Sequence, residues 1–474
     1  MLLVAFPAEA EVSDGRFHLF RSPEQARRRL FAPEAESEDK PGEKLAASPA
    51  KRHFWLAAAE VTLLNVGTWV FDRYALKADY AYISLDRWKE NLKTGFVYDH
   101  DIFSTNQALH PYHGSFYYNA ARSNGYNFWE SALFTSTGSL IFEFFGEDEP
   151  ASINDFVNTT IGGTTQGEIF HRVTNMILDN TANGSNRLFR ELGGLVLDPV
   201  GGFNRLVRGE WKKDFPNPDD RLPVSFSVEV DAGFQHNADG TAPVVRFPNQ
   251  SLVGLLIRYG DPFFGENRRP FDYFESLTEF GPPSEGTITR WQQRGQLFSW
   301  ELSASRRAEH RLGLFLNYDY TNNQAQIFSA QTLSANVLSR FPLVRGTELR
   351  TELSAIGFPL AALQTDYTAD DLAKVGRPYD YGPGGGARVL GRVTREGLDV
   401  FLLSYQALWI STTNGVSQHS AIQSLRAEGR LPLSLGLALG AGIAWNRRIT
   451  SYDQRPTVRV EGPQWRVFGT ILLQ

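Results

Sequence analysis

The chain has 474 residues, a formal net charge of −6 and 13% aromatic residues. It contains no cysteine, which excludes disulfide frameworks, thiol catalysis and thiolate metal sites. The overall charge gives no indication of nucleic-acid binding, so we expect no nucleic-acid partner. A chain of this length can hold two or three domains, although large barrels exceed that rule.

The first 52 residues have the composition of a leader followed by a linker. Residues 1–12 (MLLVAFPAEAEV) combine a short apolar stretch with Ala-Glu-Ala, as at the end of a secretory signal peptide, although the basic n-region is missing. Residues 13–52 are rich in charge, proline and alanine, and cannot bury enough apolar surface to order themselves. We predict a signal-peptide remnant at 1–12 and a disordered linker at 13–52.

Residues 53–215 are predicted to be helical and to form a plug in a barrel or a periplasmic domain. The most apolar stretch, 54–71, carries Glu60 and Asn65 near its middle. Because charged residues are costly at the centre of a bilayer, we expect this helix to pack against protein and not to cross a membrane.

The stretch HPYHGSFYYNAARSNGYNFWES at 110–131 is too polar for a core helix and too aromatic for an ordinary surface. A helix over 115–137 would carry a polar stripe on one face, made of Ser115, Asn119, Arg122, Ser123, Tyr126, Glu130 and Thr137. Such a stripe needs a buried hydrogen-bonded network or a wet cavity. Pro111 argues against regular helix at 110–113, and Gly125 weakens the helix interior.

A further helix is expected after Pro150, with Ser152 as its cap and Asp155 in its first turn. Gly163 and Gly167 are four residues apart, a spacing that lets helix backbones approach closely. We therefore expect helices at 115–145 and 152–178 to pack as a hairpin through these glycines.

Many unusual residues between 85 and 180 occur in the order found in a known bacterial family. They are Asp99, Asp101, Asn106, HPYHG at 110–114, NAARSNGYNFWES at 119–131 and INDFVNTTIGGTTQGE at 153–168. Through them the chain resembles the family of domain of unknown function 3943. No activity is assigned to that family, so the resemblance implies a Gram-negative envelope protein and no mechanism.

The polar residues of this region permit two kinds of chemistry. Metal binding would use Glu168 and His171, an E-x-x-H pair on one helix face, together with Glu143, as in carboxylate-bridged bundles. Hydrolysis or acyl transfer on an envelope lipid would use a histidine base, a serine and an orienting carboxylate. The candidates for that catalytic set are His110, His113, Ser115, Ser123, Glu130 and Asp155.

The third interpretation is structural, because buried polar groups are normally paired with one another and with backbone. The expected network consists of Asp99, Asp101, Asn106, Asn119, Arg122, Asn127 and Asn158. The glycine-rich GPGGGARVLG at 382–391 lacks the Lys-Ser/Thr of a phosphate-binding loop, so we expect no nucleotide. The sequence leaves cofactors unknown and enzymatic activity uncertain.

From Leu222 to Leu473 apolar and polar residues alternate with the two-residue period of β-strands. A soluble sandwich and an outer-membrane barrel both produce this pattern. Apolar alternations of about ten residues match a tilted membrane strand. Aromatic residues near strand ends, such as Trp409 and Trp445, also favour the barrel. The final glutamine departs from the aromatic residue that commonly ends bacterial barrels.

The sequence therefore predicts an α+β fold, in which a helical domain precedes an antiparallel outer-membrane barrel of about twelve strands at 216–474. The expected function is a structural or transport role in the cell envelope, with outer-membrane lipid around the barrel and the helices in its lumen or in the periplasm. The alternative is an outer-membrane lipid hydrolase or acyltransferase, or a metal-dependent enzyme. Oligomeric state stays open.

Overall fold

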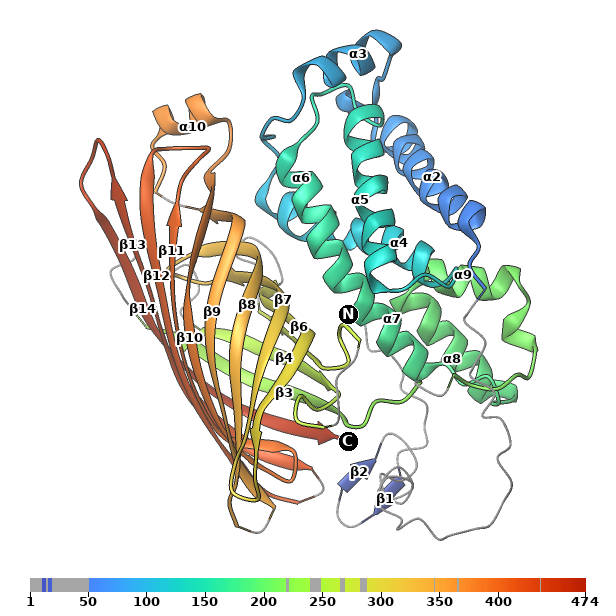
Figure 1. The fold of residues 1–474 in the computed structure, drawn as a ribbon. Coiled ribbons are helices and arrows are strands. Elements are labelled where there is room, and N and C mark those ends of the chain that lie inside the picture. The colour runs from blue at the N-terminus through green and yellow to red at the C-terminus, as the bar shows by residue number, and fades with distance from the viewer. Residues whose placement is uncertain are drawn as a thin grey trace.

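The structure is a computed structural model that describes residues 11–13, 16–18, 51–218, 221–238, 249–264, 269–281, 288–344, 346–364, 366–434 and 436–474. Helices occupy the first half of the chain and strands the second (Figure 1). Within the predicted leader and linker the structure describes two short strands, β1 (Glu11–Ser13) and β2 (Arg16–His18), and residues 51 and 52. The other predictions for residues 1–50 lie outside the described residues.

The helical region, residues 51–218, is a bundle of α-helices with short π- and 3-10 segments. Its α-helices are α2 (Phe54–Val70), α3 (Leu85–Thr94), α4 (His110–Arg122), α5 (Phe128–Phe145), α6 (Ile153–Val157), α7 (Gly163–Ile177), α8 (Gly184–Leu197) and α9 (Pro199–Val207). The π segments are η1 (Phe71–Leu76), η3 (Thr105–Leu109) and η4 (Asn158–Gly162), and the 3-10 turns are η2 (Asp79–Ala81) and η5 (Glu210–Lys212).

The polar stretch at 110–131 forms two helices and a turn. The chain is helical from η3 into α4 through Pro111, so the expectation of irregular structure at 110–113 is wrong. Proline has no N–H for the turn before it, and the carbonyls of Asn106 and Gln107 instead accept hydrogen bonds from Asn158 Nδ2 and Tyr318 Oη. Gly125, with φ of +86°, makes the turn after α4. Asn127 and Glu130 then form a reciprocal capping box that starts α5.

Helices α4 and α7 approach through glycine. A Cβ atom on Gly163 would lie 2.5 Å from the Cα of Gly114, so neither position has room for a side chain. Gly167 lies beneath the ring of Tyr118. The predicted close packing through Gly163 and Gly167 is confirmed, but the predicted single helix at 115–145 is divided into α4 and α5, and both glycines pack against α4. The Ser152 cap is confirmed, because its hydroxyl accepts a hydrogen bond from the Asp155 N–H.

Twelve antiparallel strands form a closed barrel, because each pairs with the next and the last strand pairs with β3. The strands are β3 (Phe226–Asn237), β4 (Asn249–Tyr259), β5 (Phe274–Phe280), β6 (Ile288–Ala304), β7 (Glu309–Asn322), β8 (Ile327–Pro342), β9 (Thr347–Gln364), β10 (Tyr379–Arg395), β11 (Leu398–Ser411), β12 (Gln418–Pro432), β13 (Leu437–Tyr452) and β14 (Val458–Leu473). The short helix α10 (Ala369–Val375) lies between β9 and β10. The predicted fold class is confirmed.

The strands alternate between an apolar outer face and a polar lumen. On β3, Glu229 and Asp231 line the lumen, whereas Phe234 is exposed on the outside. On β14, Arg466 is buried inside and Val467 is exposed. The two faces predicted from the two-residue period are therefore confirmed on these strands.

The helical region lies against the outer wall of the barrel (Figure 1). On β7, Asp319 faces the lumen, but Leu314 and Leu316 of the opposite face pack against the cluster that contains Tyr118 of α4. Phe128 of α5 stacks on Phe271, next to β5, with ring centroids 5.5 Å apart. The side chains that line the cavity in the lumen come from the strands. The predicted position of the helical region, in the lumen or in the periplasm, stays a prediction.

Candidate functional site

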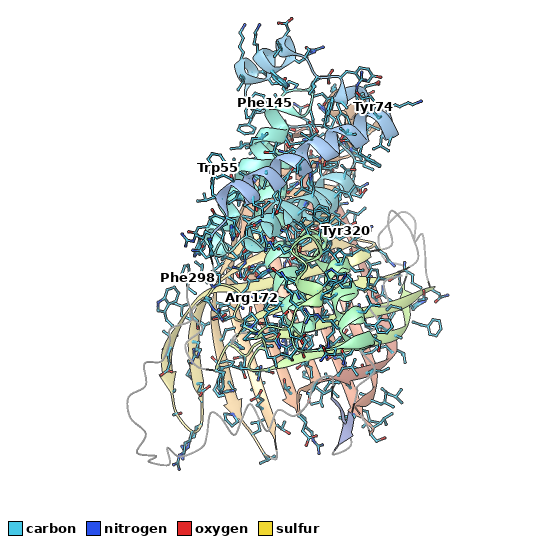
Figure 2. The ribbon with its side chains drawn as sticks, turned by 90° about the vertical axis from the view of Figure 1, so that its right-hand side faces the viewer. Trp55, Tyr74, Phe145, Arg172, Phe298 and Tyr320 are labelled. Carbon is cyan, nitrogen blue, oxygen red and sulfur yellow. The ribbon has the colours of Figure 1, made fainter. Side chains whose placement is uncertain are left out.

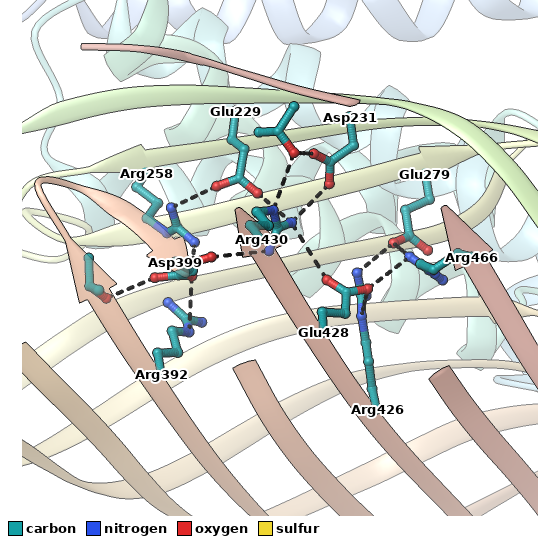
Figure 3. A network of polar contacts seen from close by, with 12 residues as sticks. Glu229, Asp231, Arg258, Glu279, Arg392, Asp399, Arg426, Glu428, Arg430 and Arg466 are labelled. Atoms are coloured by element: carbon teal, nitrogen blue, oxygen red, sulfur yellow. Dashed lines mark hydrogen bonds and ion pairs between the residues drawn. The ribbon is translucent and has the colours of Figure 1, made fainter. Parts of the chain in front are cut away.

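Charged side chains cross the lumen of the barrel in a connected network (Figure 3). Arg430 Nη2 lies 2.7 Å from Glu229 Oε1 and 3.0 Å from Asp231 Oδ2. Arg258 Nη1 lies 3.5 Å from Glu229 Oε2, and the same guanidinium pairs with Asp399. Arg430 thus joins β12 to β3, and the pair of Arg258 with Asp399 joins β4 to β11, so both link strands that are not neighbours.

A second part of the network lies beside the first. Arg466 Nη1 lies 2.8 Å from Glu279 Oε1 and 3.3 Å from Glu428 Oε1. Arg426 contacts the same two carboxylates, at 3.1 Å and 2.7 Å. Arg466 of β14 and Arg426 of β12 thus each form ion pairs with one carboxylate of β5 and one of β12. The hydrogen bonds from Arg466 to Glu279 and from Arg426 to Glu428 are charge-assisted, the stronger kind in a buried setting.

The cavity that remains between these side chains has a volume of about 150 Å³. Pockets for small organic ligands usually measure roughly 300–1,000 Å³. Arginine and acidic residues alternate around this cavity, and none of the described helices contributes to its lining. Among the described residues, this cavity is therefore smaller than the usual pocket for an organic ligand.

A different polar cluster lies inside the helical region, where α4, α5 and α6 meet. One ring nitrogen of His110 and one carboxylate oxygen each of Glu143 and Asp155 lie within 4.8 Å of one another. His110 Nε2 is 3.4 Å from Asp155 Oδ1, and Glu143 Oε2 accepts a hydrogen bond from the Ser152 N–H at 2.8 Å. Imidazole and carboxylate are common ligands of divalent metal ions, so these three residues could hold one.

Asp99 links this cluster to the barrel. Its Oδ1 accepts hydrogen bonds from the side-chain amides of Asn106 and Asn154, both at 2.7 Å. Asn106 Nδ2 also donates to the hydroxyl of Tyr379 on the outer wall of β10, at 2.8 Å. Burial, together with the neighbouring carboxylate of Asp155, raises the pKa of Asp99 to about 7.

The predicted metal ligand Glu168 is fully buried and lies in a separate ion-pair cluster. Its carboxylate accepts hydrogen bonds from Tyr118 Oη at 2.7 Å, Arg122 Nε at 2.9 Å and Arg172 Nε at 2.7 Å. Arg172 Nη1 also donates a hydrogen bond to Oδ1 of Asp272, in the segment between β4 and β5, at 3.1 Å. The carboxylate is therefore occupied by two guanidinium groups, and Glu143 lies in the other cluster.

The two candidate serines donate to the backbone of their own helix. Ser115 Oγ donates to the Tyr112 carbonyl at 2.6 Å, and Ser123 Oγ donates to the Ala120 carbonyl at 3.3 Å. Ser123 Oγ also accepts a hydrogen bond from Asn204 Nδ2 at 2.8 Å. The described contacts bring neither hydroxyl to a histidine.

The other candidates are spread over the bundle. His113 Nε2 lies 3.3 Å from Thr68 Oγ1, and His171 Nε2 lies 2.9 Å from Asn175 Nδ2. Glu130 belongs to the cap of α5 and pairs with Arg52. The residues of the predicted structural network lie in different places. Those at the joint between the helices and the barrel are Asp99, Asp101, Asn106 and Asn158. Arg122 belongs to the Glu168 cluster, Asn127 caps α5, and Asn119 is buried in α4.

Two features were not found from the sequence. Alternation placed Glu229 and Asp231 on the polar face of β3, but it does not show that Arg430 reaches them across the lumen. The second feature is a buried polar stripe on α5, made of Ser131, Thr135, Ser139 and Glu143. Its four-residue spacing was a readable signal, because residues i and i+4 share a helix face.

Residues 95–200 match the model of the family described as domain of unknown function (DUF3943), which confirms the resemblance seen in the sequence. The matched segment contains the His110, Glu143 and Asp155 cluster and the Glu168 cluster. No curated protein matches the chain.

Several solved barrels are similar to about half of the chain. The NanC porin is 11% identical over 52% of this chain and 98% of its own, with a TM-score of 0.26. OmpT of Vibrio cholerae is 8% identical over 52% and 96%, with a TM-score of 0.20. The outer membrane channel DcaP of Acinetobacter baumannii is 7% identical over 52% and 96%, with a TM-score of 0.23. Likeness at this level carries no conclusion about activity.

Proposed function

We propose that the protein is an integral barrel of a bacterial outer membrane, with a structural role, and that ion pairs hold its lumen closed. The single observation that carries the proposal is the network of arginine and carboxylate side chains across the lumen. Apolar side chains on the outer faces of the strands support contact with membrane lipid. In this proposal residues 53–215 form a helical domain attached to the barrel at 216–474.

The test of the membrane location is fractionation. The protein should be recovered with outer membranes, and its migration in SDS gels should change on heating, as for a folded barrel. Recovery in the soluble fraction would contradict the proposal.

The test of the closed lumen is electrical conductance in a planar bilayer. The wild-type barrel should pass no steady current, because the network leaves a cavity of about 150 Å³. Replacing one bridging pair by small neutral residues, in Arg466→Ser/Glu279→Ser, should open a conducting path. Steady conductance of the wild type would favour transport over a structural role.

A matched control for this experiment exists on the outer face. Arg447 and Glu461 form an ion pair between β13 and β14, with Arg447 Nε 3.7 Å from Glu461 Oε2. The variant Arg447→Ser/Glu461→Ser removes the same two residue types but leaves the lumen unchanged. This variant should pass no steady current, like the wild type.

A second candidate function is favoured by the cluster of His110, Glu143 and Asp155. In this case the helical domain is a metal-dependent enzyme carried by the barrel. Elemental analysis of protein extracted from outer membranes should then find a stoichiometric divalent metal, lost in His110→Ala and Asp155→Asn. The variant His171→Ala should retain it, because His171 contacts Asn175 and not the cluster. Wild-type protein without metal would remove this candidate.

A further inference from the structure

The apolar helix α2 keeps the polar side chains of Glu60 and Asn65 within the bundle and exposes large apolar side chains on its outer face. In α2, Ala57, Val61 and Asn65 are buried, whereas Trp55 and Leu63 are 83% and 67% exposed. The polar groups of this helix have partners inside the bundle. Asn65 Nδ2 donates to the Gly138 carbonyl at 3.1 Å, for example. This arrangement is the reverse of a surface helix in a water-soluble protein.

The same inversion occurs in α5. Its buried stripe is small and polar, including Ser131, Thr135 and Ser139, whereas Leu133 is 69% exposed. The exposed Thr137 hydroxyl donates to the carbonyl of Leu133 in its own helix at 2.9 Å, so it does not depend on water.

The α8–α9 pair is inverted as well. The buried interface contains an ion pair between Arg187 and Glu191 at 2.7 Å, and Arg205 of α9 also lies 2.7 Å from Glu191. The exposed faces of the two helices are apolar and consist of Leu188, Phe189, Leu192, Val196, Phe203, Leu206 and Val207. Four helices thus present apolar surface to the outside and keep charge within.

The exposed apolar surface of the helices continues onto the barrel. Trp129 of α5 stacks on Phe298 of β6, with ring centroids 5.9 Å apart, and Phe298 stacks on Trp300 of the same strand. All three rings are exposed on their outer sides. Trp55, Tyr74 and Phe145 lie on the outer side of the helices in Figure 2, above the labelled Phe298.

The dimensions of α2 with η1 fit a bilayer. Among the described residues, Phe54–Leu76 is the one helix that is long and apolar enough to cross a membrane, and only 17% of its most apolar part is buried. Its 23 residues span about 35 Å at ~1.5 Å per residue, against about 30 Å for a hydrocarbon core. Lys51 and Arg52 precede it and Lys77 follows it, where cationic side chains can reach lipid headgroups. Glu60 and Asn65 both have hydrogen-bond partners within the bundle, so neither polar side chain has to face lipid.

We infer that the acyl chains of the bilayer cover the outer faces of α2, α5, α8 and α9, so that the helical region is embedded in the membrane beside the barrel. This inference rests on the proposed membrane location of the barrel. Helices satisfy their backbone hydrogen bonds internally, so they tolerate such surroundings. Apolar patches of this extent on a protein surface mark contact with a membrane or with another protein. The continuity with the outer wall of β6 favours lipid over a protein partner.

The test uses single cysteines, which the chain allows because it has none of its own. Leu63→Cys on α2 and Leu133→Cys on α5 are labelled with an environment-sensitive fluorophore in the full-length protein, reconstituted in phosphatidylcholine vesicles. Val467→Cys on β14, where the native side chain is 66% exposed, reports on the barrel. Lys89→Cys on the charged helix α3, where the native side chain is 77% exposed, is the polar control.

Two quenchers distinguish the surroundings, spin-labelled acyl chains for lipid and iodide for water. Probes at positions 63 and 133 should be quenched by the spin-labelled lipid as strongly as the probe at 467 and should be insensitive to iodide. The probe at position 89 should show the opposite pattern. Phe189→Cys on α8 repeats the measurement if one variant folds poorly.

The possible failures are distinguishable. Iodide quenching at 63 and 133, with lipid quenching at 467, overturns this inference and leaves the proposed function intact. Iodide quenching at 467 overturns the proposed function itself. Protection of 63 and 133 from both quenchers means that protein covers these faces, as in a dimer of this chain, and also overturns the inference.

Discussion

Asn106 of the helical region donates a hydrogen bond to the hydroxyl of Tyr379 on the barrel, over 2.8 Å and 273 residues of sequence. The same amide also donates to Asp99. The joint between helices and barrel is therefore polar and specific at this point, and lies next to a mainly apolar contact on β4–β7. Because both partners are buried, neither has water as a substitute.

The strength of this joint can be measured by a double-mutant cycle. Asn106→Leu alone should lower the free energy of unfolding by about 1–3 kcal/mol, because Asp99 and Tyr379 lose a buried partner. Combined with Tyr379→Phe, the two changes should couple by about 0.5–3 kcal/mol in urea titrations of detergent-solubilised protein. The control pair Asn106→Leu and Tyr405→Phe, with Tyr405 on the exposed face of β11, should be additive.

Glycine substitution should separate the contact of α4 and α7 from ordinary helix propensity. Gly163→Ala places a Cβ 2.5 Å from Gly114, so the helices must move apart and the protein should lose about 1–3 kcal/mol of stability. Gly67→Ala in α2 meets nothing within 4 Å and should gain about 0.5–1 kcal/mol. Thermal unfolding of the two variants under one condition compares them. Equal effects would contradict the close packing.

Removing the Glu168 carboxylate should be the most damaging single change in the bundle. Glu168→Gln leaves Arg122 and Arg172 without their shared anion in a buried setting, which typically costs about 3–5 kcal/mol. Glu90→Gln removes an exposed ion pair with Arg87 and should change stability by at most about 1 kcal/mol. Circular dichroism of both variants during heating measures the difference. A mild effect of Glu168→Gln would argue for water around the carboxylate.

The carboxyl group of Asp198 should make the free energy of unfolding decrease as pH rises. Burial raises the pKa of this helix cap from 3.8 to about 6, so the folded protein holds its proton more tightly than the unfolded chain. The resulting stabilisation is complete below pH 3.8 and is lost as pH rises through about 6. Asp198→Asn keeps an acceptor for the Gly201 N–H and carries no charge. Melting temperatures across this range should therefore be flatter for the variant, and Asp86→Asn at an exposed site should leave the slope unchanged.

The strands were predictable because their signal is local. A period of two assigns each residue to a face, and Phe234 and Val467 lie on the predicted side. Closure through β3 and β14 follows from the number and length of the strands together. The pairing of Arg430 with Glu229 was not predictable, because it joins β12 to β3 across the lumen and depends on barrel geometry.

The sequence predicted which residues belong to the candidate site but not which of them lie together. The sequence singled out His110, Glu143 and Asp155, yet it assigned Glu143 to a set with Glu168 and His171. The helix-to-helix contacts that bring His110 to Asp155 arise from the glycine packing of α4 against η4 and α7. The sequence also does not show which strands the helices contact, because an apolar strand face has the same residue pattern whether lipid or a helix covers it.

The helices cover only one arc of the barrel, and this gives the molecule a direction. Strands of the arc from β3 to β10 carry the contacts with the helical region, whereas Phe401, Trp409, Ile443 and Val467 on β11 to β14 stay exposed. A plain barrel looks alike from every side, but this molecule has a front and a back within the plane of a membrane. A neighbouring molecule in the membrane therefore meets helices on one side of the barrel and bare strands on the other, and contacts in a crowded membrane would favour some orientations of the protein over others.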